Sequence, residues 1–160
     1  MEPNMNRPDR SGLAVAPKAI APQTRLALKT PAILVAEDDS DSREMIKILL
    51  CSKGYAVVEA ADGLQAVEVA LTKLPDLILL DLQLPLLDGV RVTRNLRQHP
   101  MLRAVPIVVI SGHDPNGHRQ VALDAGCNDY LLKPIDFERL EEILHSNVPL
   151  PGQTTMKCDS

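Results

Sequence analysis

Short apolar runs and amphipathic segments alternate along most of the chain. The apolar runs are typical of buried strands and cover residues 32–36, 55–59, 77–81, 106–110 and 129–132. Segments with apolar residues at helical spacing cover residues 40–53, 62–74, 90–98, 115–125 and 136–147. Strands that alternate with helices through short connections indicate right-handed crossovers. We therefore expect an α/β fold, with one parallel sheet between two layers of helices.

The helical spacing also predicts which side chains point into the core. In chain order, the expected inward residues are Met45, Ile46, Leu49, Leu50, Val67, Ala70, Leu71, Leu74, Val92, Leu96, Phe137, Leu140, Ile143 and Leu144. Three arginines of the third helix, Arg91, Arg94 and Arg97, are expected to face solvent, because a charged helix face is usually solvated. Docking of an acidic partner is the alternative interpretation of these three charges.

The two ends of the chain lack such patterns. Residues 1–30 contain four prolines and few large apolar residues, which indicates a mobile arm. Prolines and a glycine near the other end indicate a frayed tail. With 160 residues and 45% hydrophobic content, the chain suits one domain with a single core. We expect an arm over residues 1–30, a domain over 31–147 and a tail over 148–160, with no room for a second output domain.

Charge and hydropathy narrow the function classes. The formal net charge is −4, but residues 1–30 carry +3, so the remainder carries −7. An acidic domain argues against direct binding of nucleic acid. No apolar run reaches the ~18 residues of a membrane span, and the N-terminus lacks the apolar core of a secretory signal. We expect a cytoplasmic protein without membrane insertion.

Polar residues stand at the ends of four of the predicted strands. Glu37 and Asp38 follow the first strand, Asp81 ends the third, Ser111 follows the fourth and Lys133 follows the fifth. Each residue alone fits a helix cap, a turn or a solvated charge. Because the carboxyl ends of parallel strands share one edge, we expect all five to meet where such sheets bind ligands.

Three carboxylates at one site repel each other. Two unit charges ~4 Å apart cost about 4 kcal/mol at an effective dielectric near 20, and one lysine does not balance three acids. A hard divalent cation supplies the missing charge, and oxygen ligands without cysteine or histidine favour Mg²⁺. Mg²⁺ in proteins often accompanies phosphates, and a carboxylate such as Asp81 can serve as the nucleophile that forms an aspartyl phosphate.

Four segments together resemble the receiver domain of two-component response regulators, of the CheY-like kind. They are residues 33–39 (ILVAEDD), 80–89 (LDLQLPLLDG), 110–112 (ISG) and 125–134 (AGCNDYLLKP). The resemblance covers residues 31–147 in order and spacing. It implies a flavodoxin-like three-layer fold, with five parallel strands in the order 2-1-3-4-5 and five helices.

The resemblance also implies a role for each site residue. Asp81 would accept a phosphoryl group from a sensor histidine kinase or a histidine phosphotransfer protein. Glu37, Asp38, Asp81 and the backbone carbonyl of Gln83 would hold Mg²⁺, although the family more often has Asp at the position of Glu37.

The remaining implied roles concern the phosphoryl group and the switch. Lys133, followed by a cis bond to Pro134, would bind the phosphoryl group. Ser111 and Tyr130 would form the switch pair that remodels the surface after phosphorylation. Gln83, Gly112 and His113 would line the mouth of the site, where the family tunes the lifetime of the phosphate.

The leading hypothesis is a stand-alone response regulator that signals by phosphorylation-dependent protein binding in a phosphorelay. It would assist its own phosphotransfer and dephosphorylation without being an enzyme toward other substrates, and the downstream protein is unknown. A Mg²⁺-dependent aspartyl-phosphate phosphohydrolase is an alternative, although Gln83 occupies the position where such an enzyme needs a second acid. A receiver-like scaffold that takes no phosphate is another. A P-loop enzyme is excluded, because the sequence contains no G-x-x-x-x-G-K-[ST] run.

Overall fold

Five parallel strands form a single sheet in the computed structural model, which describes residues 30–112 and 115–150. The strands are β1 (Ala32–Ala36), β2 (Ala56–Ala60), β3 (Leu77–Asp81), β4 (Ile107–Ser111) and β5 (Asp129–Leu132). The helices within these residues are α2 (Ser40–Ser52), α3 (Gly63–Lys73), α4 (Gly89–Arg97), α5 (Pro115–Ala125) and α6 (Phe137–Asn147). The sheet order β2-β1-β3-β4-β5 confirms the predicted α/β fold and strand order.

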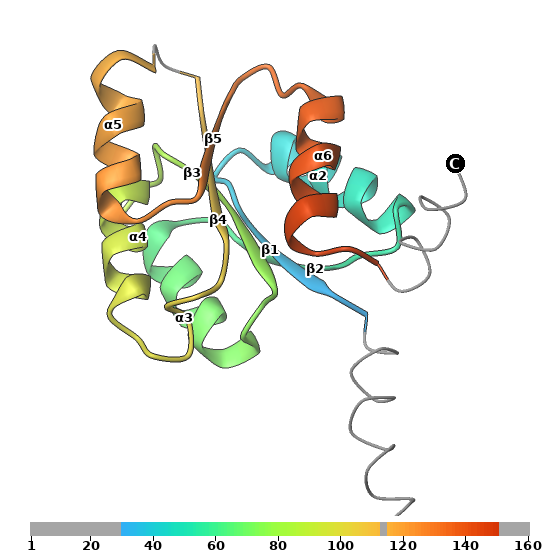
Figure 1. Cartoon of the computed structure of the whole chain (residues 1–160), viewed down its shortest axis with the longest axis horizontal. Helices are drawn as coiled ribbons and strands as arrows, with labels where there is room; N and C mark the ends of the chain where they lie inside the picture. Colours follow the sequence, from blue (N-terminus) through green and yellow to red (C-terminus); the bar gives the residue numbers. More distant parts are fainter. Residues whose placement is uncertain (1–29, 113–114, 151–160) are drawn as a thin grey trace, which may run out of the picture.

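The helices cover both faces of the sheet. Helices α3, α4 and α5 lie on one face, and α2 and α6 lie on the other (Figure 1). Every residue of the central strands β3 and β4 is buried, as expected for strands that are apolar on both faces. Two mostly aliphatic clusters, one on each side of the sheet, form the core. Among the described helices, none combines the length and apolar character that crossing a membrane requires.

Aspartates cap the helices that start near the site. The side chain of Asp39 accepts the N–H of Ser42 at 2.9 Å, and Asp88 accepts the N–H of Arg91 at 2.9 Å. These bonds satisfy free N–H groups in the first turns of α2 and α4. Helix α2 begins just after β1, and the start of α4 packs against the end of β3. The first turns of both helices therefore flank the edge of the sheet where the acidic residues lie.

Several residues predicted to face inward are exposed. Met45 is 49% exposed, and Leu71, Leu74 and Phe137 are also exposed. In α3 the buried positions are instead Gly63, Ala66 and Ala70. A Cβ atom at Gly63 would fall onto the backbone carbonyl of Leu87, so the start of this helix packs too closely for large side chains. The apolar stripe read from the sequence is therefore wider than the buried stripe.

The prediction that Arg97 faces solvent is wrong. Its guanidinium lies among backbone groups that follow α4 and α5. It donates to the carbonyl oxygens of Gly126 (2.9 Å), Leu102 (3.0 Å) and Val105 (2.8 Å) and to the side-chain oxygen of Asn128 (2.8 Å). Burial lowers the pKa of Arg97, but the side chain remains a cation that satisfies several acceptors at once.

We expect Arg97→Ala to lower the free energy of unfolding by about 3 kcal/mol, because the carbonyls of Leu102 and Val105 would lose a charged donor. Urea denaturation measures this loss. The matched control is Arg94→Ala on the exposed face of the same helix, which should change stability by less than about 0.5 kcal/mol. Equal stability of the two variants would contradict the proposed role of Arg97.

The C-terminal boundary also differs from the prediction. Val148 and Leu150 fall within the predicted tail, but they are buried against the α2–α6 side of the core. The hydroxyl of Tyr55 donates to the carbonyl of Val148 at 2.9 Å, which holds this segment after α6. The packed domain therefore continues to Leu150. The predicted arm up to residue 29, the tail from 151 onward and the loop residue His113 lie outside the described residues.

Candidate functional site

The sheet brings the predicted strand-end residues to one edge. Parallel pairing sets Ala36 beside Leu80, Asp81 beside Ile110 and Ser111 beside Leu132. The residues that follow β1 and β5 therefore lie level with Asp81 and Ser111. The sequence pattern predicted this juxtaposition, because it placed a polar residue at the carboxyl end of each of these strands.

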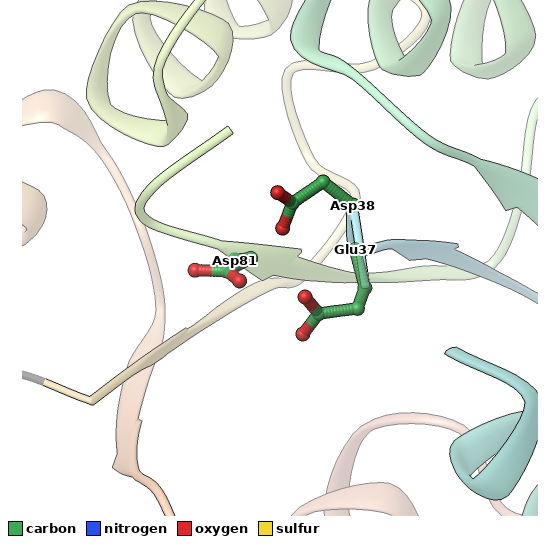
Figure 2. A group of neighbouring side chains, drawn as sticks. All are labelled: Glu37, Asp38 and Asp81. Atoms are coloured by element: carbon green, nitrogen blue, oxygen red, sulfur yellow. The ribbon is translucent and has the colours of Figure 1, made fainter. Parts of the chain in front are cut away.

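Three carboxylates converge at this edge. Oxygen atoms of Glu37, Asp38 and Asp81, one from each side chain, all lie within 4.8 Å of one another. Figure 2 shows the three side chains turned toward one shared space. Glu37 is only 3% exposed and Asp81 6%, whereas Asp38 is exposed. Burial of two anions is costly unless cations compensate their charge.

Lys133 supplies one of these cations. Its Nζ atom lies 2.9 Å from Oε1 of Glu37 and 3.0 Å from Oδ2 of Asp81. Partial burial alone would lower the pKa of this ammonium group, but the hydrogen bonds and charges of Glu37 and Asp81 outweigh burial and raise the pKa of Lys133. The lysine therefore stays charged, and the cluster of three acids and one lysine keeps an excess of two negative charges.

Backbone contacts fix the position of Asp81. The N–H of Gln83 donates to Oδ1 of Asp81 at 2.9 Å, and the N–H of Gly89 donates to the carbonyl of Leu82 at 2.8 Å. A Cβ atom at Gly89 would lie 2.6 Å from the backbone carbonyl of Asp81. The start of α4 thus packs directly on the end of β3. This contact requires glycine, whereas the N–H of Gln83 is the backbone group that holds the Asp81 carboxylate.

Arg43 supports the other side of the cluster and was not predicted. Its Nη1 donates to the carbonyl of Glu37 at 2.7 Å, and its Nε donates to Glu59 Oε1 at 3.1 Å. The Glu37 side chain is held in turn by the N–H of Asp39 at 3.1 Å. Arg43 lies near the start of α2. The run of acids just before this helix was the only feature of the sequence that could have indicated a nearby basic partner.

The two residues of the predicted switch pair lie on neighbouring strands. Ser111 is fully buried at the end of β4. Tyr130 on β5 pairs with Val109, two positions before Ser111 along β4. The Tyr130 ring is buried, its hydroxyl has no hydrogen-bond partner among the described residues, and the Arg119 guanidinium lies 5.9 Å from the ring centroid. The aromatic side chain is therefore directed into the protein beneath α5.

The donor set fits a hard divalent cation. Glu37, Asp38 and Asp81 offer only oxygen, and within residues 30–112 and 115–150 no histidine or cysteine takes part in this cluster. The excess of two negative charges matches the charge of Mg²⁺. The chemistry of the three side chains therefore agrees with the magnesium site predicted from the sequence. Gln83, whose backbone carbonyl is the fourth predicted ligand, lies two residues after Asp81 in the chain.

A family model describing the response regulator receiver domain matches residues 33–145. The chain belongs to this family. The receiver assignment agrees with the strand order and with the acidic edge of the sheet described above. Receiver domains generally act as phosphoacceptors in two-component systems, and membership of the family implies this role for the chain.

Relatives of the receiver include single-domain and longer proteins. The polar-differentiation response regulator DivK of Brucella ovis is 31% identical over 117 residues, which cover 73% of this chain and 95% of DivK. The response regulator PleD of Caulobacter vibrioides is 39% identical over 104 residues, which cover 65% of this chain. The chain spans only 23% of the length of PleD.

A solved receiver domain resembles this chain in fold and sequence. The receiver domain of the sensor histidine kinase PA1611 from Pseudomonas aeruginosa is 39% identical, with a TM-score of 0.70. The match covers 74% of this chain and 98% of that domain. That structure has a magnesium ion coordinated in its active-site cleft.

Proposed function

We propose that this receiver accepts a phosphoryl group on Asp81 from a phosphohistidine of a sensor histidine kinase or a histidine phosphotransfer protein. The observation that carries the proposal is the position of Asp81, which lies buried between two further acids and the ammonium group of Lys133. A nucleophilic carboxylate beside a metal-type donor set and a lysine suits phosphoryl transfer to an acid.

The transfer balances as a displacement at phosphorus. An oxygen of the Asp81 carboxylate bonds to phosphorus, the bond from phosphorus to the histidine nitrogen breaks, and its electron pair stays on the imidazole. Mg²⁺, held by Glu37, Asp38, Asp81 and the Gln83 carbonyl, would neutralise charge on the phosphoryl oxygens. Lys133 holds the acceptor through Oδ2 before transfer and is placed to pair with a phosphoryl oxygen afterwards.

The output would be a change of surface rather than a chemical product. Ser111 is placed at the same strand edge as Asp81, and its hydroxyl would bind a phosphoryl oxygen. Tyr130, on the neighbouring strand, already points inward beneath α5, and phosphorylation would stabilise this position. Such a change is a population shift between two packings, driven by one local charge event, and a partner protein that prefers one packing would read it.

Incubation of the full chain with Mg²⁺ and a small acyl phosphate tests the proposal, with intact mass as the measurement. We expect a mass gain of one phosphoryl group that survives acid and is removed by hydroxylamine. Multiple-turnover release of phosphate from a metabolite would favour the phosphohydrolase instead. Absence of any adduct, in a chain that a thermal melt shows to be folded, would favour a scaffold that takes no phosphate.

A further inference from the structure

A groove runs between α4 and α5, beside the phosphoacceptor site. It has a volume of about 270 Å³, and its lining includes Leu82, Gln83, Val90, Arg91, Arg94 and His118. Leu82 and Gln83 directly follow Asp81, so the groove opens next to the end of β3 without using the carboxylates or Lys133. Arg91 and Arg94 of α4 form one wall of this groove. From the sequence, these arginines could either face solvent or bind an acidic partner.

The charges of the groove are only weakly compensated. The Arg91 side chain is 71% exposed, and its Nε atom lies 3.8 Å from Oδ2 of Asp88, which is the one acid among the described residues of the lining. An ion pair at this distance between exposed groups contributes little binding energy, so Asp88 neutralises Arg91 only weakly. Arg94 makes no ion pair within residues 30–112 and 115–150. Two guanidinium groups therefore face the groove on a chain whose net charge is −4.

The groove also offers apolar surface between its charges. Val121 of α5 is exposed in the lining, and the partly buried Val90 of α4 borders the arginines. A ligand that fits must place carboxylates against the arginines and aliphatic side chains against the valines. We propose that the groove between α4 and α5 binds an acidic peptide segment of a partner protein, with Arg91 and Arg94 as the charge contacts.

The surroundings favour a peptide over a nucleic acid. Among the described residues, no Phe, Tyr or Trp lines the groove, so bases would find no large aromatic surface on which to stack. The sequence outside residues 1–30 carries −7, which opposes approach of a polyphosphate backbone. An acidic peptide carries fewer charges than a nucleic acid, so the chain repels it less. Guanidinium groups also pair with carboxylates in bidentate geometry.

A random dodecapeptide library selected on the full, unphosphorylated chain tests this proposal. The enriched peptides are then measured by fluorescence anisotropy against the parent chain, the double variant Arg91→Glu/Arg94→Glu and the control Arg103→Glu. Arg103 is exposed between α4 and β4, at the opposite edge of the sheet. Because phosphate is absent throughout, the result does not depend on the role proposed for Asp81.

We expect enriched peptides that combine Asp or Glu with aliphatic residues, and at least tenfold weaker binding to the double variant with unchanged binding to the control. Amide resonances of residues 82–94 and 117–121 should shift on binding. The proposal would be overturned if the enriched peptides lacked acids or if their binding survived the charge reversals. It would also be overturned if a single-stranded DNA oligonucleotide bound equally strongly and the double variant lost that binding. Failure to enrich any peptide on a chain with an intact thermal melt would also overturn it.

Discussion

Asp81→Asn is expected to abolish labelling of the chain by an acyl phosphate. The amide that replaces the carboxylate has no anionic oxygen to attack phosphorus, and the proposed function assigns Glu37 and Asp38 to metal binding rather than to phosphoryl acceptance. The expected loss is therefore complete within detection, rather than a slower reaction. Intact mass after incubation with Mg²⁺ and the donor measures it.

The matched control for this variant is Asp124→Asn. Asp124 is exposed on α5 and pairs with Gln120, so its change should leave labelling intact. Asp81→Asn loses the ion pair with Lys133, but it also relieves repulsion among three clustered negative charges and keeps the shape of the side chain, so the variant should remain folded in a thermal melt. Labelling of a folded Asp81→Asn chain at the parent rate would refute the assignment of Asp81.

Removal of divalent cations is expected to slow labelling by about 100-fold or more. Three carboxylates with one lysine keep an excess of two negative charges, which opposes the approach of an anionic donor. A bound metal typically contributes several kcal/mol of charge stabilisation, and each 1.36 kcal/mol corresponds to about tenfold in rate. Labelling after chelation, at ionic strength matched with sodium chloride, measures the effect.

Binding of Mg²⁺ can be measured apart from labelling. The chain contains no tryptophan, so titration calorimetry or amide resonances report binding better than intrinsic fluorescence. Asp38→Asn should weaken Mg²⁺ binding at least tenfold, whereas Asp124→Asn should leave it unchanged. Labelling that proceeds at the same rate with and without Mg²⁺ would contradict the role given to the three carboxylates.

The fold and the acidic cluster were predictable because local patterns determine them. Residues 77–80 are apolar on both faces and stop at Asp81, which gave both the central strand and the position of its last residue. Parallel strands then bring their carboxyl ends together, so residues far apart in sequence could be placed at one edge. Glu37 and Lys133 meet at 2.9 Å for this reason.

The missed features depend on tertiary contacts that no local pattern encodes. Arg97 carries a charge at a helix position that looks solvated, but loop carbonyls from Leu102 and Val105 turn back onto it. Arg43 became part of the site only because α2 passes beside the backbone of Glu37. Phe137 and Met45 follow the helical period yet lie at the margin of the buried stripe, where packing decides exposure.

A single labelling experiment identifies which of the three converging carboxylates takes up phosphate. After labelling in the presence of Mg²⁺, borohydride reduces an aspartyl phosphate to an alcohol, and mass spectrometry of peptides locates the change. We expect reduction at Asp81 alone, dependent on both the phosphate donor and Mg²⁺. Reduction at Glu37 or Asp38, or an unmodified Asp81 in a chain that carries phosphate, would contradict it.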